Sequence, residues 1–340
     1  MGQTSNSRMV LSRRAAVLAG GSAPLVFGIL GSKRAMAETI TIRIGSDSTM
    51  ADEHTVSAIK MKEHLEAKTD GRMKVTIFPS GQLGSNEVMV NAIKAGTLDI
   101  VLSDLGVLSL GVPEVSVFNL PFLFKDIPHA IRAAKGSVGA KLKPKIESAY
   151  ACEVHGWGND GLRNIWNGKR PIKSPDDLVG LKIRVQANPI HKETYTALGA
   201  LPTVVSFPEL YNALQTGVVD GADNSVPDII SEKFYQVTKY LTVTAHTSSM
   251  DILLTSSKFM SRLSPADQDL VREAGAASAD SEVDATIEGD RKGLEALKAK
   301  GMQLTTDVDL EPFKAKMRPV YDIAAKTVGQ SLIDEARTIT

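Results

Sequence analysis

The stretch EVHGWGNDGLRNIWNGKRP, residues 153–171, poses the first question about the fold. Gly156, Gly158 and Gly161 have the spacing G-x-G-x-x-G, which is typical of a dinucleotide-binding turn. In that motif a helix begins at the third glycine, because the helix N-terminus receives the pyrophosphate. Here an Asn-Gly pair and two prolines follow within 14 residues and would break such a helix. The motif also lies in mid-chain, so we reject a nucleotide site.

The N-terminus has the three parts of a secretory signal peptide. Residues 1–14 carry three arginines and no acidic residue, an uncharged run extends from Ala15 to Leu30, and AMA stands at 35–37. The uncharged run has 16 residues, with three glycines and a proline, which is short for a membrane span. We expect cleavage after Ala37 and export to the periplasm. The arginine pair leaves both the Sec and the twin-arginine export routes open.

The composition of the exported part excludes some classes of function. The chain has 39 basic and 39 acidic residues, and removing residues 1–37 takes away five basic and no acidic ones. A protein with an excess of acids is a poor candidate for binding nucleic acid, which requires phosphate neutralisation. The remaining 303 residues suffice for two domains. Cys152 is the only cysteine, so no intrachain disulfide can form.

After Glu38, short strand-like runs alternate with longer helical ones, which predicts two α/β domains, each a sheet flanked by helices. Three serine–acid pairs have the spacing of a capping box and mark helix starts at Ser174, Ser206 and Ser264. We expect strands at 39–45, 73–78, 98–102, 181–185, 203–205 and 240–244, and helices at 55–68, 86–95 and from Pro265 to about Lys300.

Signals for catalysis are weak throughout the chain. No G-x-S-x-G, P-loop or H-E-x-x-H motif occurs, and the six histidines show no metal-ligand spacing. Cys152, although close to His155, is best interpreted as a buried thiol in a strand. His54, near the start of a helix, could meet a ligand, but we expect it at the solvated surface. The sequence therefore predicts no enzyme, no cofactor and no metal ion.

Two arginines are better candidates for a site. In the run LKIRV, alternation places Leu181, Ile183 and Val185 on one face of a strand and Arg184 on the other. Arg184 stands at the carboxyl end of that strand, where open α/β sheets place their ligand crevice. A guanidinium there can bind a carboxylate through two parallel hydrogen bonds. Arg163 lies 21 residues earlier, and a solvated surface position is the alternative for both.

Six segments together resemble the dicarboxylate-binding type of solute-binding protein that serves tripartite ATP-independent periplasmic (TRAP) transporters. They occur in family order over nearly the whole exported chain. They are FPSGQLG (78–84), AIKAGTLDI (92–100), FNLPFLF (118–124), PIKSPDDLVGLKIRV (171–185), FPELYNALQTGVVDGADN (207–224) and EKFYQVTKYLTVTAH (232–246).

The resemblance implies a monomeric, two-lobed receptor of the Venus-flytrap type that closes over one organic anion and delivers it to a membrane permease. It implies that Arg184 forms the main salt bridge to the substrate carboxylate and that Arg163 assists. Asn224, in DGADN, would hydrogen-bond the ligand, and Phe207 would contact it.

First-domain contacts are less uniform in the family. By position they would be Asp47, Ser85 or Asn86, and Asp104, with Trp157 as a stacking wall or a core residue. Family members often carry Glu or Gln where this chain has Asp223, so the far end of the substrate stays open.

By the same resemblance the two domains interleave. The first would hold 38–160 and 250–289, and the second 161–249 and 290–340. The segment 153–171 would be the first crossing between the lobes, with glycines that give it freedom.

For the substrate we favour a sugar acid, a uronate or aldonate, because Asp47 and Asp104 suit hydroxyl groups and repel a second carboxylate. A C4-dicarboxylate is next. A ligand-presenting subunit of a sensor system and a periplasmic α/β enzyme acting on small acids are the alternative functions.

Overall fold

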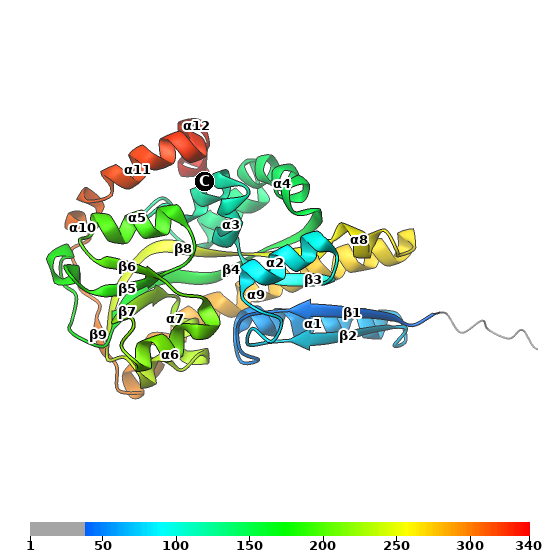
Figure 1. Cartoon of the computed structure of the whole chain (residues 1–340), viewed down its shortest axis with the longest axis horizontal. Helices are drawn as coiled ribbons and strands as arrows, with labels where there is room; N and C mark the ends of the chain where they lie inside the picture. The colour runs from blue at the N-terminus through cyan, green and yellow to red at the C-terminus, as the bar shows by residue number, and fades with distance from the viewer. Residues whose placement is uncertain (1–37) are drawn as a thin grey trace, which may run out of the picture. The chain divides into compact units, whose positions relative to one another are not determined.

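The predicted alternation of strands and helices is present in the computed structural model, which describes residues 38–340 (Figure 1). The predicted signal peptide, 1–37, lies outside the described residues. The first elements are β1 (Ile40–Gly45), α1 (Glu53–Lys68), β2 (Met73–Phe78), α2 (Asn86–Ala95), β3 (Ile100–Asp104), η1 (Leu105–Leu110), η2 (Pro113–Asn119), α3 (Ile127–Lys135) and α4 (Ser137–Tyr150).

The chain continues through a second set of strands and short helices to a helical C-terminus. These elements are β4 (Cys152–Asn167), η3 (Pro175–Leu178), β5 (Lys182–Val185), α5 (Pro189–Ala197), β6 (Leu201–Val204), η4 (Phe207–Glu209), α6 (Leu210–Gln215), β7 (Gly221–Asn224), α7 (Val226–Ser231), η5 (Phe234–Gln236) and β8 (Tyr240–Ser256). The last are α8 (Ser257–Met260), α9 (Pro265–Ala299), β9 (Gln303–Thr305), α10 (Glu311–Ala315), α11 (Arg318–Ala324), η6 (Ala325–Gly329) and α12 (Gln330–Thr338).

Within residues 38–340 the strands form one nine-stranded sheet in the order β2-β1-β3-β8-β4-β7-β5-β6, with β9 also paired to β8. The strands β1, β2 and β3 are mutually parallel at one end, and β5, β6 and β7 are parallel at the other. The alternation predicted for β1 is confirmed, since Ile42 and Ile44 are fully buried while Thr41 is exposed. The two parallel sets pair with opposite ends of the long strands, β3 with β8 and β7 with β4. The carboxyl ends of both sets therefore meet near the middle of the sheet.

Two long antiparallel strands, β4 and β8, join the two ends of the sheet (Figure 1). One end of β8 pairs with β3, and one end of β4 pairs with β7. Their mutual register is interrupted at three places, one of them between Asn159 and Gly161, opposite Met250 and Ser249. The sequence prediction recognised only part of either strand, because glycines and polar residues interrupt their apolar pattern.

The helix α9 confirms the predicted long helix and packs against β4 as well as against α1 and α7. A Cβ on Gly156 would stand 2.4 Å from Cβ of Ala279, and one on Gly158 would stand 2.4 Å from Oε1 of Glu282. These glycines therefore allow the close approach of α9. The packing gives Gly156 and Gly158 a reason besides the freedom expected of a lobe crossing, which stays a prediction.

The three capping boxes have different outcomes. Ser174 and Asp177 form the full box at η3. Ser264 accepts a hydrogen bond from the backbone N–H of Asp267 at 3.2 Å, which confirms the start of α9. Ser206 instead donates its hydroxyl to Glu209 at 2.7 Å, and no side-chain cap forms there.

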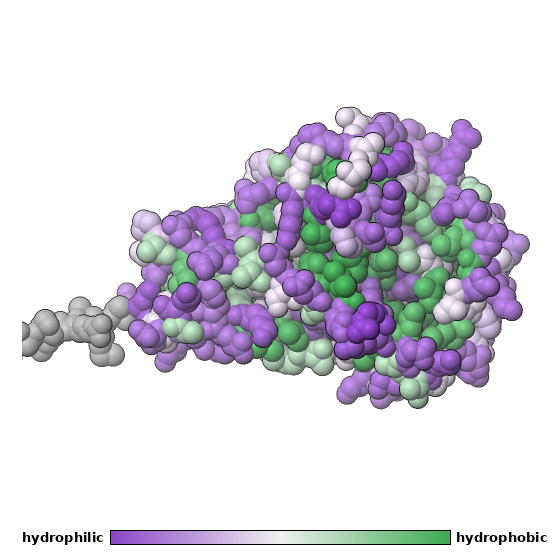
Figure 2. Space-filling view, turned by 180° about the vertical axis from the view of Figure 1, so that it is seen from behind, coloured by the Kyte–Doolittle hydropathy of each residue, from purple (hydrophilic) through white to green (hydrophobic). Residues whose placement is uncertain are grey.

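The core lies on both faces of the sheet. One cluster packs α1, β1, β2 and α9 together, and a larger one extends from α2 to α5 and the C-terminal helices. Cys152 is buried at the start of β4, as predicted, and burial raises the pKa of its thiol to about 12. The face seen in Figure 2 is mostly hydrophilic, with hydrophobic groups visible in its middle. In the described part of the chain, no helix combines the length and apolarity that crossing a membrane needs.

Candidate solute site

A cavity lies at the middle of the sheet, where the carboxyl ends of β1, β3 and β5 meet residues of the long strands β4 and β8. Its volume is about 40 Å³, and the hollow around it, including the part open to solvent, has about 460 Å³ free of protein atoms. The lining residues are Asp47, Ser48, His54, Asn86, Glu87, Asp104, Val107, Asp160, Arg163, Arg184, Gln186, Phe207, Asp228, Ser249 and Asp251.

Arg184 lies at the carboxyl end of β5 and lines the cavity, as its alternation in the sequence predicted. Arg184 is 2% exposed, and its Nε donates to the backbone carbonyl of Val205 at 2.8 Å. Its Nη1 is buried and has no hydrogen-bond partner. No carboxylate of the described residues lies within 4.0 Å of this guanidinium, so a buried cation stands without an anion.

The surroundings of Arg184 keep it in place and lower its pKa. The guanidinium lies over the half-buried ring of Phe207, 5.7 Å from the ring centroid, at a distance typical of a cation–π contact. Burial, together with the nearby positive charge of Arg163, lowers the pKa of Arg184 to about 10. The group is therefore charged at neutral pH, and an anion beside it would relieve the cost of its burial.

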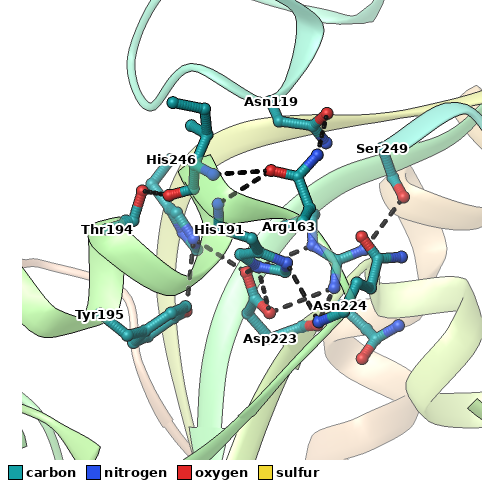
Figure 3. Close-up of polar contacts among 12 residues, drawn as sticks. Asn119, Arg163, His191, Thr194, Tyr195, Asp223, Asn224, His246 and Ser249 are labelled. Carbon is teal, nitrogen blue, oxygen red and sulfur yellow. Dashed lines mark hydrogen bonds and ion pairs between the residues drawn. The ribbon is translucent and has the colours of Figure 1, made fainter. Parts of the chain in front are cut away.

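Arg163, on β4, has a carboxylate partner in Asp223 on β7 (Figure 3). Its Nε donates to Oδ2 of Asp223 at 3.2 Å, and its Nη2 donates to Oδ1 at 3.1 Å and to the backbone carbonyl of the same residue. Its Nη1 donates to Ser249 at 3.1 Å. Burial alone would lower the pKa of Arg163, but the carboxylate of Asp223 raises it above its usual value. Most donors of this guanidinium are thus occupied.

Asp223 also contacts two histidine rings, as Figure 3 shows. Nε2 of His191 lies 2.8 Å from Oδ2 of Asp223, and Nε2 of His246 lies 3.1 Å from the same oxygen. Burial would raise the pKa of Asp223, but Arg163 and the hydrogen bonds from the histidines hold it well below its usual range. The hydroxyl of Tyr195 is 3.4 Å from His246. Asp223 is therefore an ionised, fully buried carboxylate that neutralises Arg163.

Three of the predicted first-domain residues line the cavity. Asp47 is 5% exposed, and burial raises its pKa to about 8, although Arg184 opposes the shift. Asp104 accepts the backbone N–H of Gly106 at 2.6 Å. Asn86, at the start of α2, has a buried Oδ1 without a hydrogen-bond partner.

Three other predicted residues do not line it. Ser85 donates its hydroxyl to Glu87 at 2.6 Å at the start of α2. Trp157 packs in the core, 6.3 Å between ring centroids from Phe118, which corrects its expected role as a stacking wall. Asn224 lies beside the cavity, where its Nδ2 donates to Asp228 at 2.8 Å.

The remaining lining residues were not predicted, except that a ligand contact was the alternative considered for His54. Gln186 follows β5 directly, so the argument that identified Arg184 applies to it as well. His54 is 4% exposed rather than solvated, because α1 turns it into the cavity, and burial lowers its pKa to about 4. The last three lining aspartates, Asp160, Asp228 and Asp251, lie in three separate elements, β4, α7 and β8. No local pattern in the sequence indicates that they meet at one cavity.

The lining of the cavity is rich in acidic residues. Six of the lining residues are aspartate or glutamate, against two arginines. Burial, together with the neighbouring Asp228 and Asp251, raises the pKa of Asp160 well above its usual range. Burial also raises the pKa of Glu282, behind this wall, to about 7.

Hydrogen bonds join the two halves of the molecule around the cavity. The backbone N–H of Thr49, after β1, donates to Glu232 at 2.7 Å, and Ser231, in α7, donates to Asp52 at 2.7 Å. Asn188, before α5, donates to the carbonyl of Gly106 at 3.1 Å.

An α/β scaffold that surrounds a cavity with an unpaired arginine has the features of a receptor for a small anion.

The comparisons with known proteins agree with this class. The chain matches the family described as bacterial extracellular solute-binding protein, family 7, over residues 47–327. A solute-binding protein of Verminephrobacter eiseniae is 35% identical over 304 residues, which are 89% of this chain and 90% of that protein. The TRAP periplasmic solute-binding protein from Polaromonas sp. JS666, bound to D-erythronate, has a TM-score of 0.85 at 34% identity, covering 88% of this chain and 99% of that one. The corresponding protein from Roseobacter denitrificans, with bound β-D-glucuronate, has a TM-score of 0.83 at 29% identity, covering 88% and 100%.

The chain therefore belongs to the bacterial extracellular solute-binding proteins of family 7, the solute-binding proteins of TRAP transporters. The resemblance seen in the sequence and the two-lobed α/β fold are confirmed. The expectation that the chain is not an enzyme is confirmed too, because its family consists of transport proteins. Relatives of the chain are periplasmic proteins.

Proposed function

We propose that this receptor binds a hydroxylated organic acid with one carboxylate, a sugar acid such as an aldonate or uronate, through a salt bridge to Arg184. The observation that carries the proposal is the buried Nη1 of Arg184, which has no partner and belongs to a guanidinium without a carboxylate beside it. A carboxylate can supply both hydrogen bonds and charge to such a group. Phe207 would hold the arginine from its other side.

The preference for a single carboxylate follows from the charges. Asp223 neutralises Arg163, so Arg184 is the one arginine of the cavity wall whose charge is left for a ligand. The carboxyl groups of Asp47, Asp104 and Asp160 line the rest of the cavity, where they would exchange hydrogen bonds with hydroxyl groups and provide no cation for a second carboxylate. The relatives with bound D-erythronate and β-D-glucuronate support this substrate class. A C4-dicarboxylate is the second candidate.

The proposed division of the chain places domain I at 38–160 and 250–289 and domain II at 161–249 and 290–340. The register irregularity between Asn159 and Gly161, opposite Met250 and Ser249, supports a pivot between the lobes at these boundaries. Bound solute would hold the lobes closed, because it contacts both only in that arrangement.

The wider role follows from the family. We propose a monomeric protein that is exported, cleaved after about Ala37, and delivers its solute to the membrane permease of a TRAP transporter in the periplasm. Residues 1–37 supply the signal-peptide pattern that supports export.

The test is a thermal-shift screen of the purified protein against D-erythronate, D-galactonate, D-glucuronate and succinate. At about 100 times Kd, a ligand that binds only the folded state stabilises it by about 2.7 kcal/mol. We expect a sugar acid to give the largest rise in Tm. The Arg184→Met variant should lose this rise while its ligand-free Tm stays at or above that of the parent, because a buried unpaired charge is removed.

Arg132→Ala, an exposed arginine on α3, is the matched control and should keep the full shift. An equal ligand-induced shift in Arg184→Met and in Arg132→Ala would overturn the assignment of Arg184. A larger shift with succinate than with any sugar acid would overturn the substrate class and leave the receptor role intact.

A further inference from the structure

Glu282, in the middle of α9, is a buried acid that does not line the solute cavity. It is 3% exposed, and β4 leaves room for it at Gly158, where a Cβ would stand 2.4 Å from Oε1 of Glu282. Its Oε2 accepts the hydroxyl of Ser57, on α1, at 3.2 Å. Glutamate is almost never buried to this extent unless it is paired, so the group beside it is informative.

The group beside Glu282 is a second carboxyl group, that of Asp251 on β8. Asp251 is 3% exposed, pairs with Gly158 across the two long strands and lines the solute cavity. The side chains of Asp251 and Glu282 lie within hydrogen-bond reach of each other. In the described part of the chain, Oδ2 of Asp251 and Oε1 of Glu282 are both buried and meet no donor. Two ionised carboxylates cannot satisfy each other, because both only accept hydrogen bonds.

The surroundings supply no positive charge to this pair. Within residues 38–340, neither carboxyl group has a Lys, Arg or His nitrogen within 4.0 Å. Burial lowers the pKa of His54, which lines the same cavity, to about 4, and Asp223 already neutralises Arg163. The other charged groups that act on the pair are acids from four elements: Glu53 on α1, Asp104 on β3, Asp160 on β4 and Asp228 on α7.

A shared proton would satisfy the orphaned oxygens and remove one of the two charges. Burial raises the pKa of Asp251 well above its usual range, and the neighbouring Glu282 and Asp104 raise it further. Burial raises the pKa of Glu282 to about 7, although hydrogen bonds with Asp251 and Ser57 oppose the shift. The proton belongs to the pair rather than to either residue, because the two groups titrate together.

We propose that Glu282 is a positioning residue for solute capture, which holds Asp251 in the lining of the solute cavity through a proton that their carboxyl groups share. Loss of the proton would leave two negative charges side by side, one of them in the cavity lining. That charge would repel an anionic solute, so the protonated receptor binds the solute more tightly. The effect on the solute rests on the proposed function, whereas the shared proton does not.

The first test is calorimetric titration at pH 6, 7.5 and 9 with whichever of D-erythronate, D-galactonate, D-glucuronate and succinate raises Tm most. Between pH 6 and 9 we expect the Kd of the parent to rise about 5- to 150-fold, the range of an ordinary coupling between two sites. Glu282→Gln should keep the parent's Kd at pH 6 and lose most of the rise, because its amide N–H can donate to Asp251 at every pH.

Glu295→Gln, an exposed glutamate in the same helix, is the matched control and should follow the parent at each pH. Asp47 also lines the cavity, and its pKa is raised to about 8, but it is present in all these proteins. A difference between the profiles of Glu282→Gln and Glu295→Gln therefore belongs to the pair.

Glu282→Leu separates positioning from packing, because leucine keeps the bulk of the side chain but cannot donate to Asp251. It should bind the solute about tenfold more weakly than Glu282→Gln at pH 6, which corresponds to the loss of one hydrogen bond. Equal pH profiles of the parent and Glu282→Gln, or an equal Kd for the Gln and Leu variants, would overturn the inference.

The proton is also tested without solute, by urea denaturation of the ligand-free proteins at pH 5, 6.5 and 8. Unfolded glutamate has a pKa of about 4.3, so stability from this proton is complete below that pH and is lost as pH rises through about 7. Glu282→Gln should flatten the slope relative to Glu295→Gln. Equal slopes would sink the inference even if a sugar acid binds. If none of the four acids binds, the proposed function fails and these slopes still decide the shared proton.

Discussion

The carboxylate of Asp223 and the guanidinium of Arg163 form a fully buried ion pair, with Oδ1 and Nη2 3.1 Å apart. Their pairing makes the two arginines of the site unequal, because it leaves the charge of Arg184 uncompensated. His191 and His246 complete the hydrogen bonding of Asp223 from its other side. On the proposed function, a residue that does not line the cavity would therefore leave Arg184 as the arginine that meets the solute.

Replacing Asp223 with asparagine should destabilise the protein by about 3–5 kcal/mol, because it leaves Arg163 as an uncompensated buried cation. Urea denaturation of the ligand-free protein measures this loss. The freed guanidinium should also shift solute preference towards succinate in the thermal-shift screen. Asp176→Asn, an exposed acid in η3, is the control and should change stability by less than about 0.5 kcal/mol. A stability of Asp223→Asn equal to that control would show that the ion pair contributes nothing.

Replacing Gly156 with alanine should destabilise the protein by about 1–3 kcal/mol through overpacking, since the new Cβ would meet Ala279 at 2.4 Å. Gly168→Ala is a matched control on the same chain segment, where the nearest atom would be 3.6 Å away. Denaturation midpoints of the two variants compare the sites directly. If both variants unfolded at the midpoint of the parent, the close contact of α9 with β4 would have no energetic consequence.

Part of this arrangement could be predicted from local sequence patterns. Alternation in LKIRV placed Arg184 on the polar face at the end of β5, and the structure has it there. The long helix from Pro265 was predicted from its cap and composition. By contrast, β4 and β8 were recognised only in part, because packing against α9 requires glycines where a strand pattern would have side chains.

The rest of the site depends on contacts between residues that are distant in the chain. Asp223 contacts Arg163, 60 residues away in the sequence, and His191, 32 residues away. Contacts between residues so far apart in the sequence produce no periodic pattern that could predict them. Asp52 and Asp228 each stand at or near a helix start, where an acid already has a local explanation in capping.

Trp157 and Phe207 should differ in their effects on solute binding. Trp157→Phe should leave the Kd for a bound sugar acid within about threefold and lower stability, because this ring packs in the core. Phe207→Leu should weaken binding by about 2- to 30-fold, because it removes the aromatic face under Arg184, a contact of about 0.5–2 kcal/mol. Calorimetric titration of both variants with the same acid decides between them. A larger loss of affinity in Trp157→Phe would restore its role as a stacking wall.

The ligand-free protein should become less stable as pH rises from about 4 to 8, partly through Asp47. Burial raises the pKa of Asp47 to about 8 in the folded state. The charge of Arg184 lowers this pKa, whereas the nearby acids Asp104, Glu87 and Glu232 raise it further. The folded state therefore holds a proton that the unfolded state has released. Stability from this proton is complete below the unfolded pKa, about 3.9, and is lost as pH passes the folded value. One such group gives a slope of up to about 1.4 kcal/mol per pH unit. Asp47→Asn should flatten the slope measured by urea denaturation at pH 5, 6.5 and 8 in EDTA, and an unchanged slope would exclude Asp47 as its source.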